Sequence, residues 1–110
     1  MTESALATLN EQKVAIIVAF AFVFIGFLDV ISTQMVLGLG GMEVNPLIAW
    51  IMQAGPVVWV LFKMLAHAAI GFWMYLSIEE QRHYKWIVLM FIVCMLIVTH
   101  NFVLAFSVMP

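Results

Sequence analysis

Three long runs of apolar residues constrain the fold of this chain more than any other feature of its sequence. Residues 14–37, 56–77 and 86–108 are almost free of charged side chains. Each run is close to the ~20 apolar residues that an α-helix needs to cross a bilayer. Because a helix satisfies its own backbone hydrogen bonds in lipid, the runs predict one all-α integral membrane domain over 1–110 with three transmembrane helices.

Composition supports this class and excludes others. Hydrophobic residues make up 66% of the 110 positions and charged residues only 9%, too few charges to cover the surface of a soluble domain. We therefore expect the lipid bilayer as a partner. Lys and Arg total four and form no basic patch, so we expect no nucleic acid. The single cysteine excludes an internal disulfide.

The connection between the first two crossings predicts a fourth, shorter helix. A glycine-rich stretch at 38–41 ends the first crossing. Asn45 before Pro46 is typical of a helix start, with Asn45 as the cap and Pro46 as the first helical residue. The apolar stretch that follows, about 46–53, is too short to cross a bilayer. It predicts an interfacial or re-entrant half-helix.

The distribution of basic residues predicts the orientation. Lys13 precedes the first crossing, and Arg82 and Lys85 lie between the second and third, whereas the 38–55 connection carries no Lys or Arg. The positive-inside rule places the N-terminus in the cytoplasm of a prokaryotic cell, in the inner membrane, with the half-helix and the C-terminus outside. Trp50 and Trp59 are expected at the outer interface.

Ionisable residues inside the crossings lie at similar depths. Counted from the outer ends of their helices at the helical rise, Asp29 is ~12 Å deep, Lys63 ~10 Å, His67 ~16 Å and His100 ~10 Å. Such residues are costly in lipid and mark functional sites. Three different helices thus bring charged or polar groups to one level on one side of the membrane.

Spacing within each helix strengthens this grouping. Asp29, Ser32 and Thr33 share one stripe above Gly26, whose lack of a side chain allows close approach of a neighbouring helix. Lys63 and His67 share one face of the second crossing. Two residues of the connection are expected to fold over this group, and two residues of the third crossing lie at the same level. We name the whole set the polar cluster. Its members are Asp29, Thr33, Glu43, Asn45, Lys63, His67, His100 and Asn101.

Each member also has a purely structural interpretation. Asp29 and Lys63 are equally well explained as a buried ion pair that fixes helix register. Glu43 is equally well explained as a partner for the dipole of the half-helix. Hydroxyl groups such as that of Thr33 commonly bond within their own helix. Thr99, His100 and Asn101 are consecutive, so they cannot all face the bundle.

The order of these residues resembles a family. Asp29 and Thr33, then Gly41-x-Glu43-x-Asn45-Pro46, then Lys63 are similar to the pattern of an uncharacterised, domain-of-unknown-function family of small bacterial and archaeal membrane proteins. The resemblance covers about 22–75 and implies a shared site at Asp29, Thr33, Glu43, Asn45 and Lys63. It implies no activity, and His100 lies outside the matched part.

Three functions are open on this evidence. The first is an accessory subunit that forms a homo-oligomer or joins a larger membrane complex. The second is an intramembrane site for a divalent transition metal held by Asp29, Glu43, His67 and His100, which the neighbouring Lys63 opposes. The third is a proton- or cation-coupled small carrier in which Asp29 or Glu43 titrates. No residue set specifies a reaction, so an enzyme is the less favoured class.

A haem is a further cofactor hypothesis. The segment His67-Ala-Ala-Ile-Gly-Phe-Trp73 is similar to the haem-ligating segment of the small three-helix anchor subunits of succinate dehydrogenase. The Asp-Tyr pair that those subunits use near quinone is absent here. Bis-histidine ligation of haem b would use His67 and His100. The depths of these two residues differ by ~6 Å, which makes the geometry awkward.

Overall fold

The computed structural model describes residues 2–110, and it is helical throughout except for short connections. Its elements in chain order are α1 (Glu3–Gly38), α2 (Pro46–Met52), α3 (Pro56–Ser77), the 3₁₀ turn η1 (Gln81–His83) and α4 (Tyr84–Val108). The part of the chain that is described contains no strand. Helices α1, α3 and α4 are long and apolar enough to cross a membrane. The predicted all-α membrane fold is therefore confirmed, and the predicted half-helix corresponds to α2.

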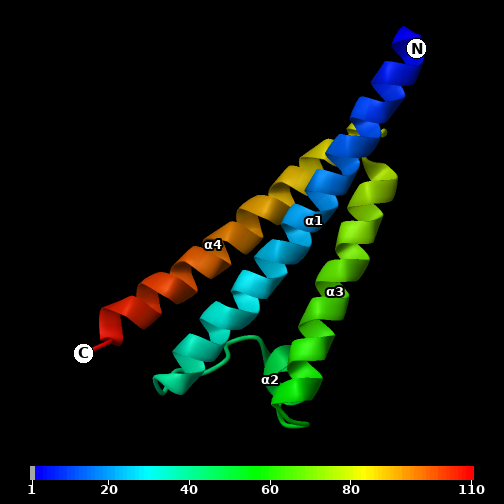
Figure 1. Cartoon of the computed structure of the whole chain (residues 1–110). Coiled ribbons are helices and arrows are strands. Elements are labelled where there is room, and N and C mark those ends of the chain that lie inside the picture. Colours follow the sequence, from blue (N-terminus) through cyan, green and yellow to red (C-terminus); the bar gives the residue numbers. More distant parts are fainter. Residues whose placement is uncertain (1) are drawn as a thin grey trace.

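Helix α1 lies at the centre of the bundle. It packs against both α3 and α4, and the chain runs down α1, back along α3 and down again along α4 (Figure 1). Helices α3 and α4 meet at the short connection that contains η1 and then diverge along their length. We call these two ends of the bundle the loop end, at η1, and the α2 end. The divergence leaves α1 as the shared partner of the other two helices.

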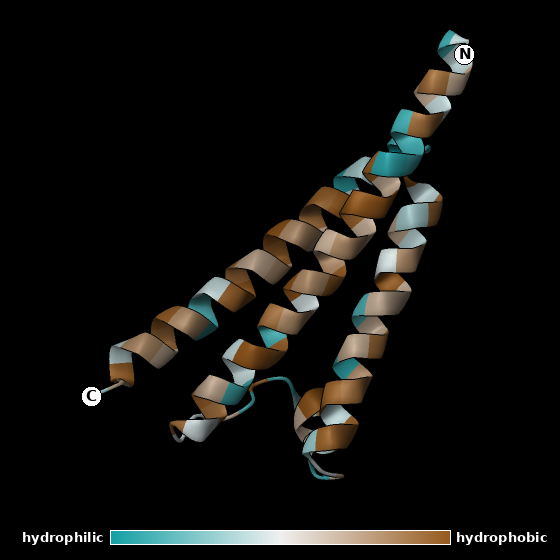
Figure 2. Cartoon of the chain, viewed as in Figure 1, coloured by the Kyte–Doolittle hydropathy of each residue, from teal (hydrophilic) through white to brown (hydrophobic). Residues whose placement is uncertain are grey.

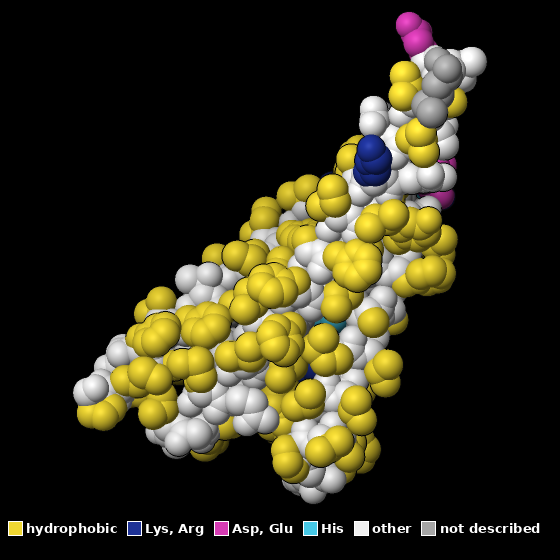
Figure 3. All heavy atoms as spheres, in the orientation of Figure 1, with side chains coloured by type: hydrophobic (Ala, Val, Ile, Leu, Met, Phe, Trp, Pro, Cys, Tyr) yellow, Lys and Arg dark blue, Asp and Glu magenta, His cyan; other side chains and the backbone are white. Residues whose placement is uncertain are grey.

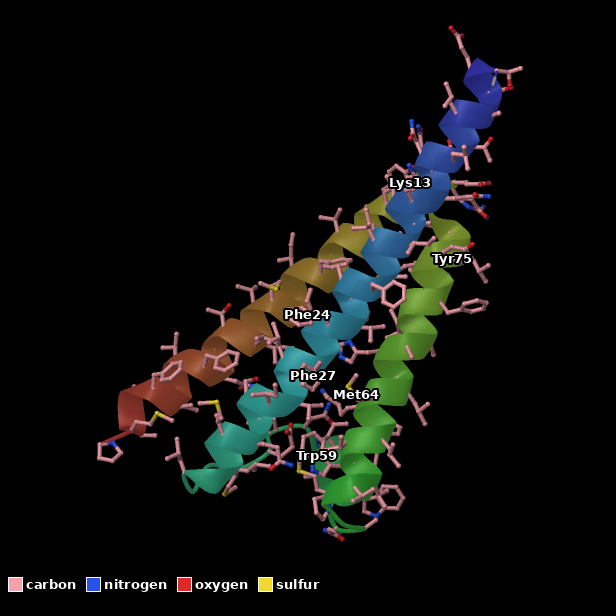
Figure 4. All side chains as sticks on the ribbon, in the orientation of Figure 1. Lys13, Phe24, Phe27, Trp59, Met64 and Tyr75 are labelled. Atoms are coloured by element: carbon pink, nitrogen blue, oxygen red, sulfur yellow. The ribbon has the colours of Figure 1, made fainter. Side chains whose placement is uncertain are left out.

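Helix α1 extends beyond the rest of the bundle. Its 36 residues would measure ~54 Å at the helical rise, against a hydrocarbon core of about 30 Å. The turns before Lys13 project past the loop end (Figure 4), and they contain most of the hydrophilic residues of this helix (Figure 2). The described chain is accordingly elongated, with dimensions of 58 × 29 × 22 Å.

Two apolar clusters hold the helices together. Near the loop end, Phe22 of α1 and Met74 of α3 pack with Ile87 of α4. Near the α2 end, Val30, Ile48 and Trp59 join α1, α2 and α3. Trp59 is only 2% exposed and lies between α3 and α1 (Figure 4). Its predicted role in an interfacial aromatic belt is therefore wrong: it packs from α3 against Val30 of α1 and Ile48 of α2, whereas Trp50 is exposed.

Glycines bring α1 and α3 close together. A Cβ atom on Gly26 would lie 2.7 Å from Nδ1 of His67, and one on Gly71 would lie 3.1 Å from the carbonyl oxygen of Ala19. Both distances are shorter than ordinary van der Waals contact, so side chains larger than glycine would separate the helices. The close approach expected at Gly26 is confirmed, and the group that occupies the space is the His67 ring.

The connection between α1 and α3 depends on glycine and asparagine. Gly40 and Gly55 adopt φ angles of +92° and +118°, a region in which side chains are strained. The Asn45 side chain accepts hydrogen bonds from the backbone N–H groups of Leu47 and Ile48, and Pro46 opens α2. The predicted cap and first residue of this helix are confirmed.

The outer surface of the bundle is apolar. Large side chains such as Phe20, Leu65 and Val57 are each more than two-thirds exposed. On the visible face, charged side chains are seen mainly toward the N-terminal end, and hydrophobic side chains cover most of the remainder (Figure 3). An apolar exterior on helices of this length fits a bilayer environment.

Candidate functional site: a polar pocket at the α2 end

An ion pair joins α1 to α3. Lys63 Nζ lies 2.6 Å from Asp29 Oδ2, so the ion pair that the sequence allowed is present. The Asp29 side chain is 10% exposed and that of Lys63 is 21% exposed. Removal of either charge would leave the other in a largely desolvated position, which is strongly unfavourable.

A second set of polar contacts joins α1 to α4. Thr33 Oγ1 donates to Asp29 Oδ1 at 3.4 Å, and Ser32 Oγ donates to the Asp29 carbonyl at 3.1 Å. Asn101 Nδ2 donates to both hydroxyl oxygens, each at 3.3 Å. Asn101 therefore faces α1 whereas Thr99 is exposed, so these neighbours point in different directions, as expected. The hydroxyl groups bond both within their helix and across to α4.

These contacts border a cavity of about 420 Å³ between α1, the α2 connection, α3 and α4. We call it the polar pocket. Its apolar wall comes from α1, the connection, α2 and α4. Its polar lining consists of seven of the eight members of the polar cluster: Asp29, Thr33, Glu43, Asn45, Lys63, His100 and Asn101. Their functional role remains a prediction, but the chain brings them to one cavity.

The connection contributes Glu43 and Asn45 to the pocket wall. The Asn45 backbone N–H donates to Glu43 Oε1 at 3.0 Å, while the Asn45 side-chain oxygen caps α2. The residues thus hold each other at the point where the chain turns into α2. Both line the pocket, in agreement with the expectation that this segment folds over the cluster.

His67 lies outside the pocket. It is 7% exposed, its ring lies 4.8 Å from the Phe22 ring, and it fills the space beside Gly26. Its Nδ1 atom has no hydrogen-bond partner within residues 2–110. His67 shares the α1-facing side of α3 with Lys63, but it lies one turn deeper, where Gly26 admits the ring.

The predicted ligand sets are not assembled. Within residues 2–110, no three His, Cys, Asp or Glu side chains lie together so as to hold a metal ion. Of the four residues assigned to a metal site, Asp29 is paired with Lys63 and His67 packs on Phe22, whereas Glu43 and His100 line the pocket. The metal site stays a prediction. His100 lines the pocket and His67 does not, and the bis-histidine haem site stays a prediction.

Sequence reasoning left out one residue of the hydrogen-bond network beside the pocket and several residues of the pocket wall. Ser32 is fully buried and accepts from Asn101, yet it was not assigned to the polar cluster. Its spacing three residues after Asp29 was a usable signal. Ile48, Leu96 and Ile97 supply apolar wall. No polarity pattern distinguishes these three from lipid-facing residues, so only the packing of the helices identifies them.

Comparison with known proteins places the chain in a family. The family model described as "Domain of unknown function (DUF5658)" matches residues 20–107, which include α2, α3 and the pocket-lining parts of α1 and α4. No curated protein and no solved structure matches the chain. Because the match covers well over half of its length, the chain belongs to the DUF5658 family, whose function is unknown.

Proposed function

We propose that this chain is a non-enzymatic subunit of a homo-oligomeric membrane assembly, in which a second copy covers the open side of the polar pocket. One observation carries the proposal. The Asp29–Lys63 ion pair lines a cavity whose α4 wall is itself exposed: Leu96 and Ile97 line the pocket while they are 65% and 47% exposed. The pocket is thus open beside these residues.

The physical reason lies in the cost of polar groups in lipid. A charged side chain near the centre of a bilayer is unfavourable by about 2.5–3.5 kcal/mol even on insertion scales. Polar groups in membrane helices are therefore found facing other helices or water. In this chain α3 and α4 diverge (Figure 1), and although the pair itself is mostly buried, the pocket that it lines is open beside Leu96 and Ile97. A helix from a neighbouring copy would complete the enclosure.

Cysteine cross-linking tests the oligomer. In a Cys94→Ser background, Leu96→Cys places a thiol at the pocket rim, and Val88→Cys places one on an exposed part of α4 nearer the loop end. We expect oxidation in native membranes to give a covalent dimer for Leu96→Cys and little for Val88→Cys. Equal cross-linking at both positions, or a single-copy mass for the chain in lipid nanodiscs, would reject a homo-oligomer closed at this rim. Stoichiometric recovery of a different membrane protein instead would favour an accessory role in a larger complex.

We also propose that the α2 end, with the pocket, faces outward in a prokaryotic inner membrane. Lys13, Arg82 and Lys85 all belong to the opposite part of the bundle, and basic residues are enriched on the cytoplasmic side. In the same Cys94→Ser background, Met42→Cys, at a side chain that is 82% exposed, is expected to react with an impermeant maleimide in intact cells. Gln81→Cys is expected to react only after lysis, and the reverse pattern would invert the orientation.

A further inference from the structure

We propose that the polar pocket binds a protonated amine that carries a compact apolar body, with the Glu43 carboxylate as its counter-ion. The site is formed within one chain, so the inference goes beyond the proposed oligomer and does not depend on it. It rests on the net charge of the pocket, on the free carboxylate oxygen of Glu43 and on the apolar side chains of the pocket wall.

The carboxylates and the lysine of the pocket together have one excess negative charge. Asp29 and Lys63 neutralise each other at 2.6 Å, and Glu43 lines the same cavity. Lys63 is the only Lys or Arg in the pocket lining, and within residues 2–110 no Lys, Arg or His forms a salt bridge with Glu43. An anionic ligand would meet two carboxylates and one amine that is already paired. A cation is therefore the favoured ligand.

Glu43 has the geometry of an available counter-ion. Its Oε1 atom accepts from the Asn45 backbone N–H at 3.0 Å, which holds the carboxylate at the pocket wall. For the other oxygen, the described part of the chain offers no hydrogen-bond donor. A charge-assisted hydrogen bond to that oxygen is the strongest polar contact the pocket offers. A divalent metal is disfavoured, because no group of three suitable ligands is assembled within residues 2–110.

The pocket wall narrows the class of cation. The cavity volume of about 420 Å³ is in the range typical of small-molecule sites. Ile48, Leu96 and Ile97 give it apolar surface for a hydrocarbon body. No Phe, Tyr or Trp among residues 2–110 lines it, so it lacks the aromatic cage that typically recognises quaternary ammonium ions. The favoured head group is therefore one whose N–H groups can donate hydrogen bonds to Glu43 Oε2 and to neighbouring acceptors.

Three matched probes test the inference. We would measure binding of 1-adamantylamine, its trimethylammonium analogue and neutral 1-adamantanol to the chain in zwitterionic nanodiscs by equilibrium dialysis. Empty nanodiscs correct for partition into lipid. We expect the amine to bind at least tenfold more tightly than the alcohol and more tightly than the trimethylammonium ion. An amine that binds no better than the alcohol would overturn the proposal, and equal binding of the two cations would overturn the N–H requirement.

Two variants locate the counter-ion. Glu43→Gln keeps an oxygen that can accept from the Asn45 N–H, so the turn is preserved while the charge is lost. We expect it to abolish the preference for amine over alcohol. Glu3→Gln, at the far end of α1, is the charge-matched control and should bind as the unmodified chain does. Unchanged amine binding in Glu43→Gln, with a native circular dichroism spectrum, would contradict the role of Glu43. Dialysis of the unmodified chain in nanodiscs that hold one copy and in nanodiscs that hold several separates this result from the oligomer test, since the site lies in one copy.

Discussion

At the residue scale, the contacts of one carboxylate connect three helices. Asp29 on α1 uses Oδ2 for Lys63 on α3 and Oδ1 for the Thr33 hydroxyl, which in turn accepts from Asn101 on α4. Each contact compensates part of the desolvation of the carboxylate. The network is therefore expected to behave as a unit, in which the loss of one member weakens the others.

The ion pair gives the first prediction. Lys63→Met should leave the Asp29 carboxylate unpaired and lower the free energy of unfolding by on the order of 2 kcal/mol. We expect less than the roughly 3–5 kcal/mol of a fully buried pair, because the Lys63 side chain is 21% exposed. The double variant Asp29→Asn/Lys63→Met should recover much of the loss. Reversible unfolding in bicelles measures both values, and equal destabilisation in the single and double variants would contradict an energetic ion pair.

The depth of a residue in the membrane was enough to predict the ion pair. It was not enough to predict which side chains line the pocket, because that also depends on which way each helix face points. Asp29 and Lys63 lie at matched depths on facing helices, and the sequence pattern identified them as a possible pair. His67 lies on the same face of α3 but one turn deeper, and depth alone suggested a site. The sequence could not show that Gly26 leaves room for its ring, because that depends on the crossing of α1 and α3.

At the element scale, α1 provides both packing surfaces of the bundle. Its contact with α3 uses Gly26 opposite His67 and Ala19 opposite Gly71. Its contact with α4 uses the apolar cluster around Phe22 and the Asn101 hydrogen bonds. Small residues on the side that faces α3, and apolar and hydrogen-bonded contacts on the side that faces α4, allow α1 to pack against both helices.

Gly26→Ala tests the closest of these contacts. The new methyl group would lie 2.7 Å from His67 Nδ1 and 2.8 Å from its Cβ. It should separate α1 from α3 and destabilise the fold by about 1–3 kcal/mol, as overpacking does. Gly38→Ala on the same helix is the matched control, since a Cβ there meets nothing within 4 Å. Equal thermal stability of the two variants would contradict the tight crossing.

The cap of α2 gives a local prediction. Asn45→Ala removes the side-chain acceptor for Leu47 and Ile48, and it should destabilise α2 by about 1 kcal/mol. Amide hydrogen exchange should speed up at these two positions while the core of α3 is unchanged. Asn45→Asp, which retains an acceptor, should restore protection. Global rather than local acceleration would show that the cap supports more than α2.

The helix boundaries were predictable to different extents. Gly38–Gly41 and Asn45–Pro46 mark where α1 ends and α2 begins, because glycine and a capped proline act through local geometry. The start of α1 at Glu3 was less visible, since residues before 14 are polar and carry no membrane signal. Their helicity comes from continuation of a long helix, with the Thr2 cap at its start.

At the scale of the whole molecule, the bundle widens toward the α2 end. Helices α3 and α4 are adjacent in sequence, yet they separate along their length (Figure 1), and the polar pocket lies in the wider half. Hydropathy identifies the crossings but contains no information on how far apart they pack. The pocket, and the assignment of Leu96 and Ile97 to its wall, therefore required the three-dimensional arrangement.

Spin-label distances test this shape. In a Cys94→Ser background, labels at Val57 and Val103 report on the α2 end, and labels at Leu76 and Val88 on the loop end; all four positions are exposed. We expect pulsed-dipolar spectroscopy in nanodiscs to give a clearly longer distance for the first pair. Similar distances at both ends would indicate that the helices close together in lipid and that the pocket is smaller than described.

The position of Asp29 and Lys63 on different helices has a consequence for biosynthesis. Asp29 leaves the ribosome first, and its partner follows only after the α2 connection and the start of α3 have been made. The nascent α1 therefore enters the bilayer with an uncompensated carboxylate, which its long apolar stretch must outweigh for insertion to proceed. Pairing with Lys63 is then expected to offset part of this penalty as α3 packs against α1, which would favour docking of the second crossing before the third.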